Sequence, residues 1–212
     1  VEVLYPKMIE SDLGKFESIL IGKSFVDIKR IGKWLLFDLN DYYLLSHLRM
    51  EGKFFIKNQS EEIDKHEHVI ITFEDNTDLR YADVRKFGKM NLVRKNDLDK
   101  VEAIKKQGIE PISDKLSKEY LYDNFKNKKL PMKTLLLDQT IIAGLGNIYA
   151  DEVLFASRIN PIKKGCEITL DECENIKNTS KKIITEAIKH GGTTIRSYTS
   201  SLGVTGRFQQ RS

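Results

Sequence analysis

The sequence has 212 residues, a mass of 24.5 kDa and a mean hydropathy of −0.40, with 40% hydrophobic and 31% charged residues. This composition excludes wholesale disorder, and no apolar run approaches the ~18 residues of a membrane span. The two cysteines, Cys166 and Cys173, are too few for a disulfide framework or a four-ligand zinc site. We therefore expect a soluble, intracellular chain of one large domain or two small ones, with no metal ligands of its own.

The net charge of +4 is small, but charge is unevenly distributed along the chain. Acidic residues concentrate at 61–64 and 167–174, away from three basic groups. These groups are Lys29, Arg30 and Lys33; Arg80, Arg85, Lys86 and Lys89; and Lys126, Lys128, Lys129 and Lys133. Segregated charge favours a polyanion bound on one side of the molecule, and ordinary solvated lysine faces are the alternative.

The first half of the chain has the pattern of β-structure. A short helix is expected at 11–20, followed by strand-sized runs rich in β-branched and aromatic residues at 24–31, 34–39, 42–47, 53–57, 68–73, 78–81 and 89–94. Turn residues such as Asn40-Asp41 and Asp75-Asn76 separate these runs. Seven short strands at this spacing indicate an antiparallel sandwich or barrel.

The second half has helical periodicity, with helices expected at 97–107, 117–128, 132–139, 146–157 and 169–190. Thr169 and Glu172 have the spacing of a capping box, and Gly191-Gly192 is expected to end the last helix. We predict an α+β protein in which an antiparallel β-sandwich domain over 1–96 is followed by a helical domain over 97–212. The tail from 193 onward is expected to be an exposed loop.

The most specific local pattern is Gly144-Leu145-Gly146-Asn147, which precedes a helix with Ile148, Val153, Leu154 and Phe155 expected on one side. A glycine-rich turn before a helix leaves backbone N–H groups unpaired, which suits a phosphate. A tight turn between two closely packed helices requires the same glycines. The residues alone leave both interpretations open.

Five blocks, collinear over nearly the whole chain, resemble the bacterial formamidopyrimidine-DNA glycosylases. They are IGKWLLF at 31–37, HLRMEGKF at 47–54, YADVRKFG at 81–88, the region 133–154 with its DQT and GLGNIYADEVL runs, and HGGTTIRSY at 190–198. The fourth block resembles the family's helix–two-turn–helix region. The Arg85 and Phe87 block is closer to the 8-oxoguanine enzymes than to endonuclease VIII. The resemblance implies a β-sandwich and a helix–two-turn–helix domain with DNA bound between them.

The resemblance implies roles for residues in a protein that bends duplex DNA, flips a lesion out and fills the gap. The gap-filling residues match Met50, Arg85 and Phe87. The phosphate-gripping residues match Lys33, His47 and Asn147, with Lys33 also assisting the reaction, and a lysine near the lesion pocket matches Lys133. The flank of the lesion-capping loop matches Thr193, Thr194, Arg196, Ser197 and Tyr198. Without the resemblance, Met50 and Phe87 would be assigned to the core.

The family's catalytic segment has no match in this sequence. The family uses the amine of an N-terminal proline as nucleophile, followed by a glutamate, whereas this chain begins Val1-Glu2-Val3-Leu4-Tyr5-Pro6. Neither Glu2 nor Pro6 corresponds to that pair, so no catalytic residue is assigned in this chain. The family's C-terminal zinc finger also has no counterpart. We expect a chain that lacks both ends of the family's fold, with one zinc ion in the full-length member and none here.

Three interpretations follow. The first is a base-excision repair glycosylase and AP lyase that removes oxidised purines, 8-oxoguanine and formamidopyrimidines, from duplex DNA through a Schiff base. The second is a non-catalytic fragment that binds damaged DNA. The third assigns the helical half to another nucleic acid, as in ribosomal and topoisomerase proteins, and the matching β half argues against it. The expected partner is double-stranded DNA with oxidised purines or abasic sites, bound by a monomer in the bacterial cytoplasm at the nucleoid, with no membrane contact.

Overall fold

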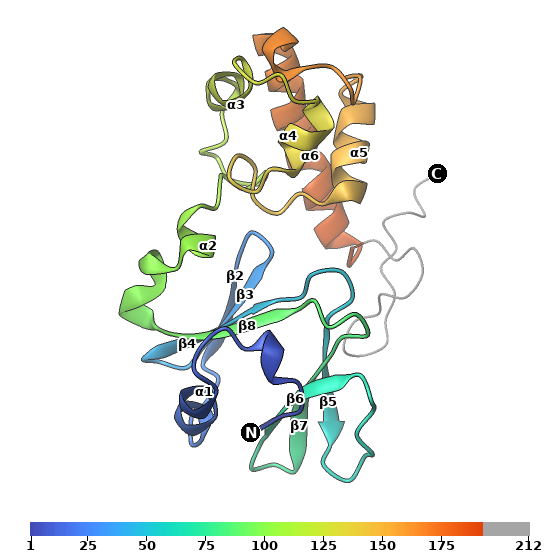
Figure 1. Cartoon of the computed structure of the whole chain (residues 1–212). Coiled ribbons are helices and arrows are strands. Elements are labelled where there is room, and N and C mark those ends of the chain that lie inside the picture. The colour runs from blue at the N-terminus through green and yellow to red at the C-terminus, as the bar shows by residue number, and fades with distance from the viewer. Residues whose placement is uncertain (193–212) are drawn as a thin grey trace. The chain divides into compact units, whose positions relative to one another are not determined.

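The structure is a computed structural model that describes residues 1–192. These residues form two compact units, 1–101 and 102–192, whose α-helices and strands from β2 onward are labelled in Figure 1. The predicted lesion-loop residues lie outside the described residues: Thr193, Thr194, Arg196, Ser197 and Tyr198.

The first unit contains two four-stranded sheets in which all neighbouring strands are antiparallel. One sheet has the order β1 (Glu2–Val3), β6 (Glu67–Thr72), β7 (Thr77–Ala82) and β5 (Lys53–Asn58). The other has the order β2 (Asp27–Ile31), β3 (Trp34–Asp38), β4 (Tyr42–His47) and β8 (Lys89–Arg94). The seven predicted strands and the α+β class are confirmed. The eighth strand, β1, was not predicted because a two-residue strand has no periodicity.

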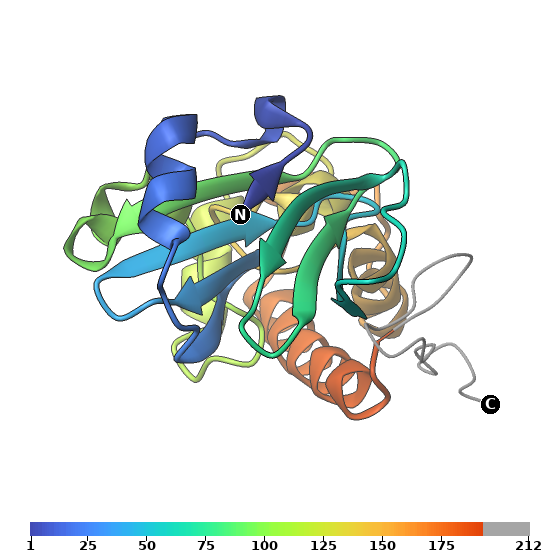
Figure 2. The ribbon, with the colours of Figure 1, turned by 90° about the horizontal axis from the view of Figure 1, so that it is seen from below.

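The core of the first unit is built from alternate residues of both sheets, as in a sandwich. Helix α1 (Leu13–Leu20) lies beside the strands in Figure 2 and buries Phe16 and Leu20 in this core. Its first turn is capped by Asp12, whose Oδ1 accepts from the Lys15 N–H at 2.8 Å. The short 3₁₀ helix η1 (Pro6–Met8) adds Met8. The strands contribute Phe37, Leu39, Leu44, Val69, Ile71, Leu79, Tyr81 and Met90.

A buried ion network occupies the face of β7 opposite the core. Arg80 is only 1% exposed, and its guanidinium donates to Asp78 Oδ2 at 3.0 Å and to Glu67 Oε2 at 3.1 Å. It also donates to the main-chain carbonyls of Asn58, Glu61 and Glu62. The prediction that Arg80 belongs to a surface basic group is therefore wrong, because its charge is neutralised inside the fold.

The link between the units differs from the single helix predicted at 97–107. The structure has a 3₁₀ helix, η2 (Lys95–Lys100), and a short α2 (Glu102–Lys105). Val101 separates them with extended backbone angles, φ −74° and ψ 107°. Periodicity alone did not reveal this interruption.

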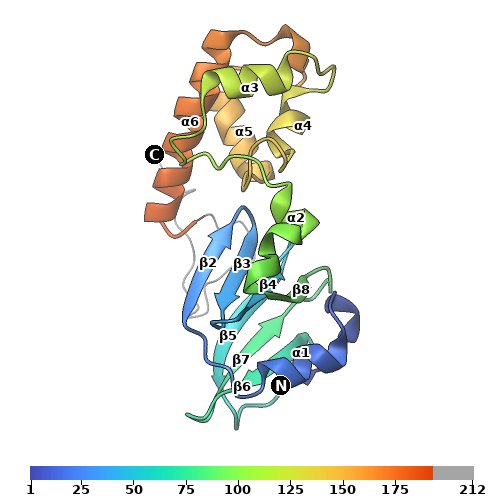
Figure 3. The ribbon, with the colours of Figure 1, turned by 90° about the vertical axis from the view of Figure 1, so that its left-hand side faces the viewer.

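The second unit is helical, with α3 (Lys118–Phe125), α4 (Met132–Leu137), α5 (Asn147–Ala156), η3 (Gly165–Glu167) and α6 (Leu170–Lys189). Helix α6 packs against α3 and α5 (Figure 3). Its predicted capping box is confirmed, since Thr169 accepts from the Glu172 N–H and Glu172 accepts from the Thr169 N–H. Within the described part of the chain, none of the helices combines the length and apolar character needed to cross a membrane.

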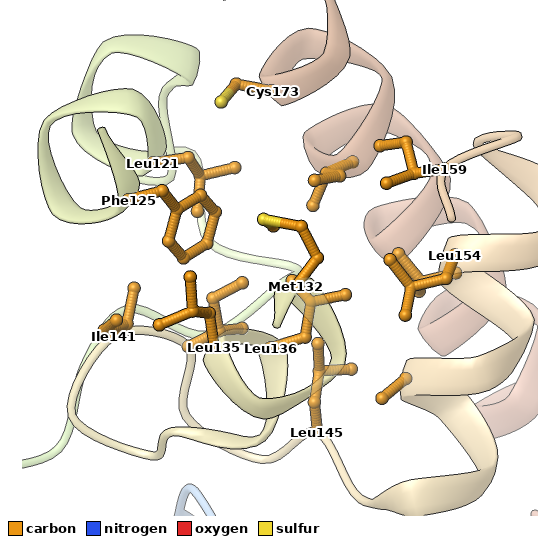
Figure 4. Packing of buried hydrophobic residues seen from close by; sticks show 14 of the residues in the cluster. Leu121, Phe125, Met132, Leu135, Leu136, Ile141, Leu145, Leu154, Ile159 and Cys173 are labelled. Carbon is orange, nitrogen blue, oxygen red and sulfur yellow. The ribbon is translucent and has the colours of Figure 1, made fainter. Parts of the chain in front are cut away.

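The helical core draws on all the longer helices of this unit (Figure 4). Its members include Leu121, Phe125, Met132, Leu135, Leu136, Leu145, Leu154 and Cys173. The expected apolar side of α5 needs correction: Val153 and Leu154 are buried, whereas Ile148 is 40% and Phe155 84% exposed. At 100° per residue these two pairs fall on opposite faces of the helix.

Candidate nucleic-acid interface

Lys33 stands at the tip of the β2–β3 hairpin. The two-residue turn Gly32-Lys33 needs a positive φ, and Gly32 supplies it at +57°. The Arg30 guanidinium donates to the Gly32 carbonyl at 2.8 Å and steadies the turn. Burial of the ammonium group, followed by the nearby charge of Arg49, lowers the pKa of Lys33. Lys33 is thus an amine with a weakened preference for its charged form, so a phosphate anion nearby would restore that preference.

His47 ends β4 and lies opposite Trp34 on β3, with the two rings edge to face at a centroid distance of 5.0 Å. The Arg49 N–H donates to His47 Nδ1 at 3.0 Å. Burial, then the charges of Arg49 and Lys33, lower the pKa of His47 to about 4. The ring is therefore neutral at pH 7 and carries its proton on Nε2. His47 can offer this N–H to an anion without contributing a charge.

Met50 lies at the tip of the loop that follows β4, here named the Met50 loop (residues 48–52). The Gly52 N–H donates to the Leu48 carbonyl at 3.0 Å and closes the loop. Arg49 takes a left-handed backbone conformation with φ +54°. The Met50 side chain is 68% exposed, which removes the alternative assignment to the core.

Arg85 and Phe87 lie on the loop between β7 and β8, here named the Phe87 loop (residues 83–88). The Asp83 carboxylate accepts from the Arg85 N–H at 3.0 Å and from the Gly88 N–H at 2.8 Å. Phe87 is 50% exposed, and the Arg85 guanidinium carbon lies 4.8 Å from its ring centroid. The loop therefore presents a flat cation stacked on an exposed aromatic ring, a pair suited to contacting bases.

In the helical unit, the connection from α4 to α5 is fixed by side chains. Gln139 donates to the carbonyls of Leu137 and Leu145, both at 2.9 Å, and accepts from the Gly144 N–H at 2.9 Å. Gly144 has φ +97°, a conformation that few residues other than glycine adopt. The turn is therefore tight, as close packing of two helices requires. It also leads directly into a helix N-terminus, the feature that suits a phosphate.

The N-terminus of α5 is open to an anion. Gly146 is its N-cap residue with an extended backbone, no side chain of the described chain caps this end, and the first turn has no acidic residue. Asn147 is the first helical residue and is exposed. The backbone N–H groups of this turn and the helix dipole favour a phosphate, and the Asn147 amide adds a donor.

The charge of Lys133 on α4 is paired with a carboxylate. Its ammonium nitrogen lies 2.8 Å from Asp151 Oδ1 on α5. Both side chains are partly exposed, so this ion pair is weak and open to competition from a phosphate. Lys133 remains a predicted DNA contact whose charge is paired in this state.

The residues that the structure describes do not fit a zinc ion. Cys166 is exposed and Cys173 is buried in the helical core. Burial, and then the charge of Glu172, raise the pKa of the Cys173 thiol to about 12. In residues 1–192, no group of three or more His, Cys, Asp or Glu side chains is placed to hold a metal.

Glu2 and Pro6 are part of the sandwich framework. Glu2 lies in β1 and is paired with Ile70 of β6. Pro6 begins η1, and its nitrogen is a tertiary amide without a proton. The Pro6 nitrogen therefore cannot act as an amine nucleophile.

Three further residues shape this interface and were not singled out from the sequence: Arg49, Tyr81 and Asp83. Arg49 lowers the pKa of both Lys33 and His47. Tyr81 and Asp83 anchor the Phe87 loop. The glycines that end the two loops, Gly52 and Gly88, were the available signal, because a Cβ at either position would clash with the Tyr81 hydroxyl group.

Comparison with known proteins gives a consistent match over the whole described chain. The family model of the formamidopyrimidine-DNA glycosylase N-terminal domain matches residues 1–90, and that of the formamidopyrimidine-DNA glycosylase H2TH domain matches residues 107–199. The formamidopyrimidine-DNA glycosylase of Lactobacillus delbrueckii subsp. bulgaricus is 41% identical over 211 residues, covering 100% of this chain and 77% of that protein. The one from Bacillus anthracis is 42% identical over 212 residues, covering 99% and 77%.

Solved structures agree with this match. Lactococcus lactis Fpg in complex with DNA containing an abasic site has a TM-score of 0.92 and 36% identity, over 99% of this chain and 77% of that one. The G226P mutant of Lactococcus lactis FPG, in complex with a Fapy-dG containing DNA, has a TM-score of 0.92 and 35% identity, over the same shares. Sequence and fold together place the chain in one family: it belongs to the formamidopyrimidine-DNA glycosylases.

Proposed function

We propose that this chain binds duplex DNA at oxidised purines, 8-oxoguanine and formamidopyrimidines, and at abasic sites, as a base-excision repair glycosylase does. The observation that carries the proposal is the exposure of Met50 and Phe87 on two anchored loops of one unit, with Arg85 stacked on Phe87. A base flipped out of a duplex leaves a gap that apolar and aromatic side chains can fill. The solved Lactococcus lactis complexes with abasic and Fapy-dG DNA support the same partner.

Phosphate binding is the second element of the proposal. Lys33 supplies a cation, His47 a neutral N–H donor, and the start of α5 with Asn147 a set of backbone and amide donors. Lys133 adds a second cation once a phosphate replaces Asp151. Such contacts position the duplex, whereas Met50, Arg85 and Phe87 act where the damaged base has left the stack.

Excision and strand cleavage through a Schiff base would follow the family's chemistry, which needs an amine nucleophile. Damage binding without catalysis is the second candidate, because the nitrogen of Pro6 is a tertiary amide and cannot supply that amine. Lys33 is a candidate amine in the first unit, because its lowered pKa raises the fraction of the neutral, nucleophilic form.

Borohydride trapping separates the two candidates. The chain would be incubated with duplex DNA containing one 8-oxoguanine or one abasic site, reduced, and examined for a covalent complex. Lys33→Ala and Lys182→Ala, a change at an exposed lysine of α6, are matched variants. Trapping that only Lys33→Ala abolishes supports Lys33 as the amine, and trapping in both supports another amine. Damage-selective binding without trapping supports the non-catalytic candidate, and equal affinity for intact and damaged duplexes refutes the proposal.

A further inference from the structure

We propose that Tyr81 and Asp83 are positioning residues that join the Met50 loop and the Phe87 loop into one rigid element, so that both loop tips enter the duplex together. This inference rests on the proposed function. It assigns no contact with DNA to either residue. Their role is to fix the geometry of the exposed side chains beside them.

The first observation is that the two loops converge on one hydroxyl group. Tyr81 is buried in the sandwich core, and its ring lies 5.1 Å from that of Phe54. A Cβ atom added at Gly52 would lie 2.3 Å from the Tyr81 hydroxyl oxygen, and one added at Gly88 would lie 1.7 Å from it. Both loops therefore end in glycine because their backbones pack directly against the same phenol.

The second observation is that Asp83 binds this hydroxyl to the Phe87 loop. The Tyr81 hydroxyl donates to Asp83 Oδ2 at 3.3 Å, and the same oxygen accepts from the Gly88 N–H at 2.8 Å. The other carboxylate oxygen accepts from the Arg85 N–H. Burial, and then the charge of Asp83, raise the pKa of Tyr81, which keeps its hydroxyl protonated as a donor.

The backbone of Asp83 is held as firmly as its side chain. Its carbonyl is 2.8 Å from Nε2 of the buried His68, and its N–H donates to the His66 carbonyl at 2.9 Å. The Lys86 N–H donates to the same Asp83 carbonyl at 3.2 Å. Asp83 thus connects β6, the end of β7 and the Phe87 loop, and Tyr81 extends this connection to the Met50 loop.

A joined pair of loops has a clear advantage for entering a base stack. Unstacking a base step is costly, and each side chain that becomes ordered only on binding reduces the affinity further. Loops that are held in advance avoid this ordering cost. If the connection is lost, Met50 and Phe87 insert independently, and we expect about tenfold weaker binding to a gapped site from two newly mobile side chains.

The test uses the 212-residue chain and a duplex with a tetrahydrofuran abasic analogue opposite 2-aminopurine. Tyr81→Phe keeps the ring and removes the hydroxyl, and Asp83→Asn removes the charge. We expect both variants to bind this duplex about tenfold more weakly, with a smaller 2-aminopurine fluorescence change at saturation and an unaltered salt dependence. Tyr120→Phe is the matched control, because it removes a hydroxyl that donates to the Ile141 carbonyl in the other unit.

A double-mutant cycle gives the sharper readout. Met50→Ala and Phe87→Ala are combined in the wild-type chain and in Tyr81→Phe. We expect non-additive losses of affinity in the wild type and additive losses in Tyr81→Phe. Both alanine changes are at exposed side chains, so the wild-type cycle tests the coupling without altering the buried residues. Additive losses in the wild type, or equal coupling in both backgrounds, would overturn the inference while leaving the proposed function intact. A wild-type chain that does not prefer abasic over intact duplex would overturn the proposed function itself.

Discussion

Lys33 and His47 lie close enough in the candidate interface for the Lys33 charge to lower the pKa of His47, yet the two residues should respond differently to salt. A lysine that neutralises one phosphate contributes about 0.9 to the slope of log K against log [salt]. Between 50 and 200 mM salt this slope corresponds to about a 3.5-fold change in affinity. Lys33→Ala should therefore bind abasic duplex more weakly and lose about 3.5-fold less affinity over this salt range than the wild type does.

His47→Ala should behave differently because the His47 ring is neutral at pH 7.5, well above its pKa of about 4. Its loss removes a hydrogen bond to a charged group, worth about 1.5–3 kcal/mol, but releases no counterion. The affinity should fall at every salt concentration while the slope stays at the wild-type value. His47→Gln, which offers a neutral N–H donor, should restore part of the affinity.

Fluorescence anisotropy with a labelled abasic duplex measures both quantities at pH 7.5 over a series of salt concentrations. A slope that His47→Ala lowers as much as Lys33→Ala does would refute a neutral His47, because the ring would then be charged in the complex. An unchanged slope in Lys33→Ala would refute the contact between Lys33 and a phosphate. Lys182→Ala, at an exposed lysine of α6, controls for a general loss of positive charge.

Three predictions concern stability. Arg80→Ala leaves the buried Asp78 carboxylate without its cationic partner and leaves Glu67 with Lys57 alone, and urea titration should show a loss of about 3–5 kcal/mol. Arg158→Gly relieves a left-handed residue (φ +56°) after α5 and should raise the free energy of unfolding by about 0.5–1 kcal/mol. His47 is neutral in the fold with a pKa of about 4, below the usual 6.5. Stability should therefore fall as the pH drops from about 6.5 toward 4, and His47→Gln should reduce this fall in pH-dependent melting experiments.

Much of the fold could be predicted from local signals. The capping box of Thr169 and Glu172 and the glycines at 191–192 define α6 because they satisfy backbone groups at its two ends. Strand β1 was missed because its two residues become a strand only by pairing with β6. The break at Val101 was missed because it falls where the first unit ends, and no local pattern marks that boundary. The apolar face of α5 was misassigned although the helical repeat separates its residues: at 100° per residue, Ile148 and Phe155 lie opposite Val153 and Leu154.

The interface was less predictable than the fold. A basic residue in a strand has the same sequence signature on the surface and in a buried ion network, so Arg80 was grouped with Arg85 although only Arg85 is exposed. The alternation of Asp78 and Arg80 on one face of β7 was the available signal. The lowered pKa of His47 could not be predicted from local sequence, because it arises from burial and from the charges of Arg49 and Lys33, which the fold brings near the ring.

Selectivity for damaged DNA and affinity for any duplex should depend on different residues of this chain. The Met50 side chain is 68% exposed at the tip of a loop that a backbone hydrogen bond closes, whereas the Met132 side chain is buried in the helical core. In the proposed function, Met50 and Phe87 contact bases that have lost a neighbour, whereas Lys33 and Asn147 bind phosphates, which every duplex carries. Met50→Ala should lower the ratio of affinities for abasic and intact duplex, and Asn147→Ala should lower both affinities alike. Competition between the two duplexes measures this ratio. A ratio that falls equally in both variants would mean that selectivity does not reside in the loops, and the assignment of Met50 as a gap-filling residue would be wrong.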